Sequence, residues 1–138
     1  MFITQNDYRV VVGEAALKTI TQASPDIVET AEAEAIEEIM GYLRPQYDVD
    51  KIFSATDKER NPQIVMITVD IALYHMVSAM PQRMGSEVRS ERYKRAVGWL
   101  EDVQRGTIVP NLPQATDPDT GSPAADTIRA GSSFRPVW

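Results

Sequence analysis

The fold is decided by residues 61–79, which read NPQIVMITVDIALYHMVSA. Asn61 followed by Pro62 is a helix start, because the asparagine side chain caps free backbone N–H groups and proline at the first helical position has no N–H to lose. The following residues are apolar on nearly every side of the helix: Ile64, Val65, Ile67, Val69, Ile71, Ala72, Leu73 and Val77. Such a helix is typical of the centre of a bundle, so we expect it to be surrounded by others.

A second long helix is expected upstream, from residue 25 to about residue 43. Ser24 and Pro25 repeat the start signal, and Pro45 marks the end because proline disfavours helical geometry in the residue before it. Apolar residues recur at the helical spacing, which predicts a buried face made of Ile36, Ile39, Met40 and Leu43.

A third long helix is expected downstream of residue 85. Ser86 is predicted to cap it, with Glu87 in the positive first turn, and Gly106 is predicted to stop it. Its core stripe consists of Tyr93, Ala96, Val97 and Leu100, with Trp99 and Val103 beside it.

The remaining segments predict two short helices and a tail. Thr4 can cap a helix that ends at Val12, Gly13 breaks it, and a second short helix is expected over residues 14–20. Residues 45–60 are polar and mixed in charge, which predicts a loop with room for one helical turn. The run at residues 10–12 (VVV) is the one strand candidate, and it is too short to build a sheet. The predicted fold class is therefore all-α, a small helical bundle of three long and two short helices.

Composition changes after Gly106, because residues 107–138 hold five of the nine prolines and show no helical apolar period. We therefore divide the chain into a helical domain, residues 1–106, and an extended proline-rich C-terminal arm, residues 107–138.

Composition also bounds the function. The 138 residues carry 14 basic and 20 acidic side chains, a formal charge of -6, which argues against broad binding to nucleic acid or anionic lipid. The absence of cysteine excludes disulfides, cysteine-based zinc sites and thiol nucleophiles, and a single histidine excludes a multi-histidine metal site. No signal-peptide pattern and no apolar run of about 18 residues is present, so we expect a soluble, intracellularly made protein with no membrane partner.

Charge is distributed unevenly along the chain. Residues 24–43 carry six acidic and no basic side chains. Glu34 and Glu38 are like-charged i, i+4 neighbours, and Glu37 lies beside them. This face is open to three interpretations: a solvated surface, a contact with a basic partner, or the lining of a channel through which DNA slides without sticking. A carboxylate pair for metal or acid–base chemistry is disfavoured, because the apolar stripe occupies the buried side.

Residues 83–106 carry six basic side chains against four acidic ones. Arg89, Arg92 and Arg95 are the candidates for an interface, and Arg95 is also expected to pair with Glu91 one turn away. The alternatives are a charged solvent face and a subunit interface. In the second case the acidic helix of one copy would meet the basic helix of the next, and such head-to-tail contacts close into rings or continue as filaments.

His75 is in line with Ile64, Ile67 and Ile71, so we expect a core residue with a satisfied hydrogen bond. Asp70 lies on another face of the helix, so a catalytic triad is not supported. With no cysteine and no glycine-rich phosphate loop, the chain is predicted not to be an enzyme and to hold no metal or cofactor.

The arm is too polar and too rich in proline to order itself alone in water. Its end contains Phe134, Arg135 and Trp138, residue types that are enriched in interface hot spots, and Arg129 lies just upstream. These four residues are candidates for docking onto another protein. Packing of the arm against its own chain is the alternative.

Four segments together resemble the phage head–tail connector (adaptor) family, as found in Mu-like prophages and siphophage-type virions. They are residues 2–8 (FITQNDY), 39–47 (IMGYLRPQY), 69–74 (VDIALY) and 92–106 (RYKRAVGWLEDVQRG). The resemblance covers most of residues 1–113 and departs from the family pattern in residues 48–61, where the link is longer and charged.

The resemblance implies a virion structural protein of the neck. Such proteins form a homo-oligomeric ring of about twelve copies below the portal protein. The ring extends the DNA channel, lets DNA pass without specific binding, and receives the next neck or tail connector protein. The C-terminal segments of such proteins typically reach towards the portal, which would make Arg129, Phe134, Arg135 and Trp138 a portal-docking arm. The alternative function is a small helical regulatory or DNA-associated scaffold module, with residues 62–105 as a helix-turn-helix.

Overall fold

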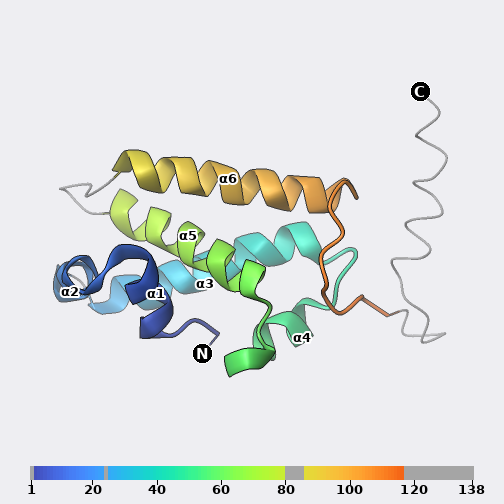
Figure 1. The fold of residues 1–138 in the computed structure, drawn as a ribbon, viewed down its shortest axis with the longest axis horizontal. Coiled ribbons are helices and arrows are strands. Elements are labelled where there is room, and N and C mark those ends of the chain that lie inside the picture. Colours follow the sequence, from blue (N-terminus) through green and yellow to red (C-terminus); the bar gives the residue numbers. More distant parts are fainter. Residues whose placement is uncertain (1, 24, 80–85, 117–138) are drawn as a thin grey trace.

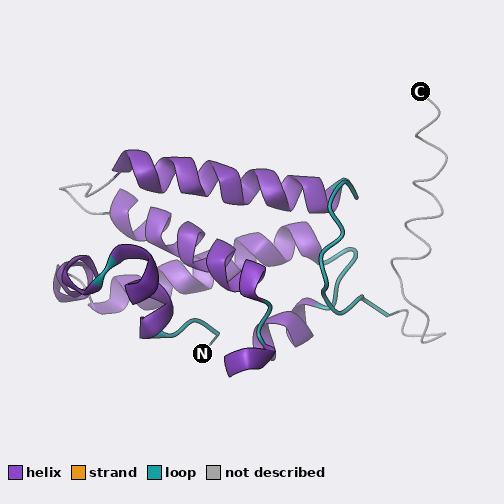
Figure 2. Ribbon diagram, viewed as in Figure 1, coloured by secondary structure: helices purple, strands orange, loops and turns teal. Residues whose placement is uncertain are grey.

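The computed structural model describes residues 2–23, 25–79 and 86–116. Within these ranges it contains six α-helices and one short 3₁₀ helix, and no strand (Figures 1 and 2). The predicted all-α class is confirmed.

Three long helices form the centre of the molecule: α3 (Pro25–Leu43), α5 (Pro62–Ser78) and α6 (Ser86–Gln104). Helix α5 packs against both α3 and α6, which also contact each other. Figure 1 shows α5 and α6 side by side and running in opposite directions. Five apolar side chains of α5 are completely buried, namely Ile64, Ile71, Ala72, Leu73 and Met76. Burying an isoleucine or leucine contributes about 2 kcal/mol relative to its exposure, so the central helix supplies much of the core free energy, as its sequence predicts.

The predicted start of α5 is confirmed in atomic detail. The Asn61 side-chain oxygen accepts hydrogen bonds from the backbone N–H groups of Gln63 (2.9 Å) and Ile64 (3.2 Å). Helix α3 has the predicted bounds, but its expected cap, Ser24, lies outside the described residues. Helix α6 already includes Ser86, so this residue belongs to the helix instead of preceding it.

The buried face of α3 is slightly rotated from its expected position. Ile39 and Leu43 are fully buried as predicted, whereas Ile36 and Met40 are only partly buried. Ala31 and Ala35 complete the face. The buried residues are thus spaced by four, which leaves Ile36 and Met40 at the edge of the contact.

Two short helices, α1 (Gln5–Val12) and α2 (Glu14–Ala23), precede the three long helices in the chain. The expected cap at Thr4 is a reciprocal one: the Thr4 hydroxyl accepts from the Asp7 N–H (3.3 Å), and the Asp7 carboxylate accepts from the Thr4 N–H (2.7 Å). Gly13 separates the helices at φ +83°, a conformation that favours glycine. Helix α2 runs three residues beyond its predicted end at Ile20.

The segment expected as a loop, residues 45–60, contains more helix than predicted. It holds α4 (Val49–Ser54) and the 3₁₀ helix η1 (Asp57–Glu59). The Asp48 side chain caps α4 by accepting from the Lys51 N–H (3.2 Å), while Val49 and Ile52 are buried. Burial of these two apolar residues holds this short helix against the core. Because charged residues surround them in the sequence, they form no recognisable apolar pattern.

Helix α6 ends where Gly106 predicts. The N–H of Gly106 bonds the Val103 carbonyl (3.0 Å) and that of Thr107 bonds the Asp102 carbonyl (2.9 Å), and Gly106 has φ +83°. This pair of bonds is a Schellman stop.

The chain then returns across its own domain. Leu112 is buried, and the N–H of Asp48 donates to the Pro113 carbonyl (2.8 Å). The N–H of Ala115 donates to the Gln46 carbonyl (3.1 Å), and Tyr47 pairs with Gln114 in an antiparallel bridge. The first ten residues of the proline-rich arm are therefore held by their own subunit.

Candidate interaction surface

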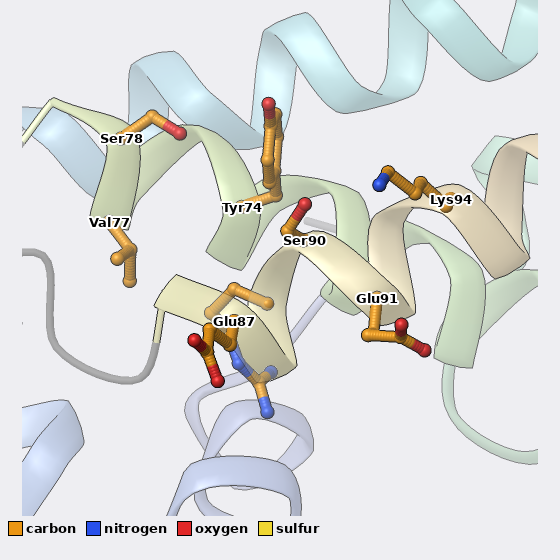
Figure 3. A pocket seen from close by; sticks show the side chains of 8 residues that line it. Tyr74, Val77, Ser78, Glu87, Ser90, Glu91 and Lys94 are labelled. Carbon is orange, nitrogen blue, oxygen red and sulfur yellow. The ribbon is translucent and has the colours of Figure 1, made fainter.

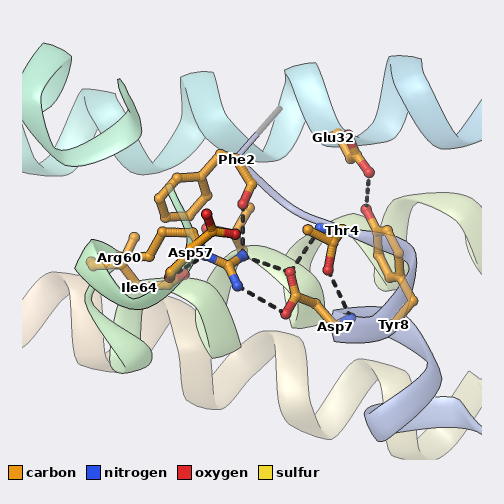
Figure 4. Close-up of polar contacts among 9 residues, drawn as sticks. Phe2, Thr4, Asp7, Tyr8, Glu32, Asp57, Arg60 and Ile64 are labelled. Atoms are coloured by element: carbon orange, nitrogen blue, oxygen red, sulfur yellow. Dashed lines mark hydrogen bonds and ion pairs between the residues drawn. The ribbon is translucent and has the colours of Figure 1, made fainter. Parts of the chain in front are cut away.

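The N-terminal segment is attached to the core through Arg60 (Figure 4). The Arg60 guanidinium lies 2.6 Å from one oxygen of Asp7 and 3.3 Å from the other, and it donates to the Phe2 carbonyl at 2.7 Å. Both charged side chains are only 14% exposed. One arginine thus ties α1, the preceding segment and the start of α5 into a single unit.

The ionisation of Asp7 follows from this arrangement. Burial on its own would raise the pKa of Asp7, but the hydrogen bonds from Arg60 and Thr4 outweigh burial and lower the pKa below its usual value. Asp7 is therefore a carboxylate at neutral pH and stabilises the folded state in that form.

A second tie joins α1 to α3. The Tyr8 hydroxyl donates to Glu32 at 2.7 Å, and both residues are buried (Figure 4). Burial raises the pKa of Glu32, although the hydrogen bond from Tyr8 opposes this. Burial, reinforced by the neighbouring carboxylate, also raises the pKa of Tyr8, so the phenol stays protonated and remains the donor.

Tyr8→Phe is expected to lower the free energy of unfolding by about 2 kcal/mol at pH 7.5, because the buried Glu32 carboxylate loses its hydrogen bond. A group with a raised folded pKa destabilises the fold once it is ionised, so the deficit should shrink as the pH falls through the pKa of Glu32. Urea denaturation at pH 7.5 and pH 4 measures both effects. Tyr42→Phe, on the partly exposed side of α3, is the control. A deficit that does not depend on pH would contradict the assignment.

The third tie joins α5 to α6. Arg92 lies 2.6 Å from one oxygen of Asp70 and 3.1 Å from the other, a two-pronged pair in which Asp70 is 6% exposed. Arg92, a predicted interface residue, is therefore engaged inside its own subunit.

The acidic helix α3 does not present one uniform acidic face. Glu34 and Glu37 are exposed, as an interface or channel face requires, and Glu37 lies 3.4 Å from Arg44. Glu38 is only half-exposed, and Glu32 is buried. The predicted trio is thus divided, because Glu38 turns towards α5.

The basic helix is divided in the same way. Arg95 is exposed, but no ion pair joins it to Glu91 within the described part of the chain, so that predicted pair is wrong. Arg89 is half-buried, and its Nη1 atom has no hydrogen-bond partner among the described residues. Burial lowers the pKa of Arg89, and Asp70 opposes this shift.

His75, on α5, lies next to Glu38 of α3. Its side chain is 25% exposed, and Nε2 lies 3.5 Å from the Glu38 carboxylate. Nε2 has no hydrogen bond among the described residues, so the expected satisfied core histidine is wrong in that respect. Burial and the Glu38 carboxylate raise the pKa of Tyr93 to about 12, so Tyr93 stays protonated beside this pair.

A pocket of about 620 Å³ lies between the end of α5 and the start of α6 (Figure 3). Tyr74, Val77 and Ser78 line it from α5. The α6 side contributes Glu87, Arg89, Ser90, Glu91 and Lys94. Two carboxylates there face two cations, so the pocket has no dominant charge.

A larger groove of about 790 Å³ lies between α1, the first half of α5 and the first half of α6. We call it the apolar groove; its apolar lining is Val10, Val11, Pro62, Val65, Met66, Val69 and Val88. Val10, Val88 and Met66 are exposed by 77%, 55% and 41%. Isolated exposed apolar side chains are ordinary, but a cluster in a groove is typical of an interaction site.

The apolar groove was not predicted from the sequence. The sequence signal that could have indicated it is the run of three valines at residues 10–12. Three consecutive residues point to different sides of a helix, so a single contact with the core cannot bury all three valines. The candidate docking residues Arg129, Phe134, Arg135 and Trp138 lie outside the described residues.

A comparison with protein-family models decides the family. The model described as "Bacteriophage Mu, Gp36" matches residues 2–127, which is nearly the whole chain. This chain belongs to the bacteriophage Mu Gp36 family. It is thus a phage protein of Mu-like type, which agrees with the coarser part of the resemblance read from the sequence.

Neither the curated proteins nor the solved structures contain a match to this member of the Mu Gp36 family. In the part of the chain that the structure describes, no helix is long and apolar enough to cross a membrane. The same residues contain no group of three His, Cys, Asp or Glu side chains that could hold a metal ion.

Proposed function

We propose that this Mu Gp36 family protein is a head–tail connector, a structural adaptor of the virion neck. About twelve copies form a ring below the portal protein. The ring extends the DNA channel and joins the head to the next neck or tail component. It performs no catalysis and needs no cofactor.

The observation that carries the proposal is where the connector-like segments fall within a phage-family chain. The family match covers residues 2–127, and the segments that resemble head–tail connectors overlap α1, α3, α5 and α6. Asp70 and Arg92, which join α5 to α6, both lie in those segments. The resemblance therefore coincides with the contacts that hold the core together.

The polar groups of the core support a structural role. Tyr8 and Asp70 each join one helix to another, and Asp7 joins α1 to the segment just before α5. Such ties make the subunit a rigid block, which a ring that carries mechanical load requires.

The exposed carboxylates of α3 fit a DNA channel. Glu34 and Glu37 point to solvent, and Arg44 offsets only part of their charge. A wall of this sign repels phosphate, so DNA would pass without sticking.

Mixing the full-length protein with its portal tests the assembly. Native mass measurement and particle imaging should show a closed ring of this chain seated on the portal. A protein that stays monomeric at high concentration with the portal present would refute the proposal.

Removal of the arm after Thr116 should leave a folded domain and abolish portal attachment. Cutting here keeps the bonds of Pro113 and Ala115 to residues 48 and 46, so circular dichroism should show an unchanged helical signal and thermal midpoint. The full-length double variant Phe134→Ala/Trp138→Ala removes only the two aromatic side chains of the arm, and it should also lose attachment. Normal docking of the truncated protein would show that the arm does not bind the portal.

The alternative, a DNA-associated module, gains no support from the helix geometry. The helices of a helix-turn-helix cross at about 90–120°, whereas α5 and α6 run antiparallel along one another (Figure 1). Arg92 is also already bound by Asp70. A DNA mobility shift that disappears with added salt would favour the alternative over the connector.

A further inference from the structure

Exposed apolar side chains occur at two separate places on the subunit. Three of the large exposed ones, Val10, Met66 and Val88, belong to the apolar groove at the start of α6. The other large hydrophobic found exposed among the described residues is Val109, at 69%, just beyond the end of α6. Helix α6 has 19 residues. Val88 lies 16 residues before the end of this helix at Gln104, so about 24 Å of helix separates it from the Val109 end, at 1.5 Å per residue.

The two places also have complementary hydrogen-bonding groups. In the groove, Arg89 has a buried Nη1 atom without a partner. At the other end, none of the hydrogen bonds found among the described residues uses the carbonyl oxygens of Thr107, Ile108 or Val109. One end thus holds an unpaired donor, and the other holds unpaired acceptors.

The segment around Val109, residues 107–110, is held in place by hydrogen bonds of its own subunit, and we call it the plug. The N–H groups of Thr107 and Ile108 both bond the Asp102 carbonyl, and Leu112 is buried a few residues on. A segment that is already fixed loses little conformational entropy on binding.

We propose that the apolar groove of one subunit receives residues 107–110 of the next subunit. Val109 enters between Val10, Met66 and Val88, and a carbonyl of the plug accepts a hydrogen bond from Arg89. The contact joins two different surfaces, so it propagates head to tail and closes into a ring when the rotation allows. The inference rests on the proposed ring and supplies its subunit contact.

A second copy is the occupant that fits both observations. Each subunit carries one groove and one plug, so a closed ring covers every groove and every plug. A two-fold contact of groove against groove would leave Val109 exposed and would place two Arg89 side chains together. Arg89 lines the groove and its Nη1 atom has no partner among the described residues, which favours an occupant that offers an acceptor, as the plug does.

The absence of cysteine allows a direct test by disulfide cross-linking. The full-length double variant Val88→Cys/Val109→Cys, assembled and then mildly oxidised, should give a ladder of covalent oligomers on a denaturing gel. Each single variant should give none, because a head-to-tail contact never brings two equivalent residues together. The pair Lys18→Cys/Val109→Cys is the matched control, because Lys18 is exposed on α2 and does not line the groove.

The outcomes separate this inference from the proposed function. A portal-bound ring without a ladder overturns the groove contact and leaves the connector proposal standing. A ladder without a portal-bound ring supports the contact and counts against the connector. Covalent dimers of the single variant Val88→Cys would show a two-fold contact and overturn the inference.

A charge placed at the plug provides a measurement without cross-linking. Val109→Glu should weaken self-association by at least about tenfold, because it puts a charged side chain into an apolar groove. Val109→Ile should keep assembly intact. Val109 is exposed, so both variants should fold with an unchanged helical signal, and equal assembly of the two would refute the contact.

Discussion

Arg92→Ala is expected to lower the free energy of unfolding by about 3 kcal/mol. The reason is the burial of its partner: Asp70 is 6% exposed, and Arg92 supplies both of its charge-assisted hydrogen bonds. Without Arg92, the buried carboxylate between α5 and α6 loses both of these hydrogen bonds, although Arg89 still lies near enough to act on it electrostatically. A loss of this size should lower the thermal midpoint by roughly 10–20 °C in a domain of about 100 residues.

Substitution of the partner, Asp70, should lower the free energy of unfolding by less. Asp70→Ala leaves Arg92, whose side chain is 31% exposed and can turn towards water. Arg95→Ala is the matched control, because Arg95 is exposed on the same helix, and it should change stability by less than about 0.5 kcal/mol. Equal effects of Arg92→Ala and Arg95→Ala in urea denaturation would show that the Asp70 pair does not hold the helices together.

The long helices could be predicted because their signals are local. Asn61 and Pro62 start α5 by chemistry that involves only the next few residues, and Gly106 stops α6 in the same way. The apolar period of α5 then placed it at the centre of the bundle. Helix α4 was missed because its two anchors, Val49 and Ile52, are too few to form a period.

The surface features could not be predicted in the same way, because they depend on pairing between distant residues. Glu32 and Glu34 look alike in the sequence, yet Tyr8, 24 residues before Glu32, makes one of them a buried acceptor. Arg92 and Arg95 also look alike, and Asp70, 22 residues before Arg92, withdraws it from the surface. The apolar groove needs three helices to meet, so no single stretch of sequence contains it.

Arg60→Ala is expected to lower the free energy of unfolding by about 3 kcal/mol near pH 7, since it removes the partner of a largely buried carboxylate. It also removes the bond to the Phe2 carbonyl, so the segment before α1 should loosen from the core. Hydrogen exchange should show this loosening in residues 2–12, while α5 and α6 stay protected. Lys58→Ala, an exposed cation two residues away, is the control and should have little effect.

The pH dependence identifies the cause of that loss. The folded pKa of Asp7 lies below its ordinary value of 3.8, although burial opposes the shift, because Arg60 and Thr4 bond the carboxylate. A group with a lowered folded pKa stabilises the protein above its unfolded pKa, and this stabilisation disappears as the pH falls through the folded value. The difference between wild type and Arg60→Ala should therefore be largest above about pH 5 and should shrink below pH 3.8. Arg60 also lies over the Phe2 ring, with the guanidinium carbon 5.9 Å from the ring centroid. A difference that stays constant down to pH 3 would mean that Arg60 acts only through the Phe2 carbonyl and the Phe2 ring, and that its ion pair with Asp7 contributes nothing.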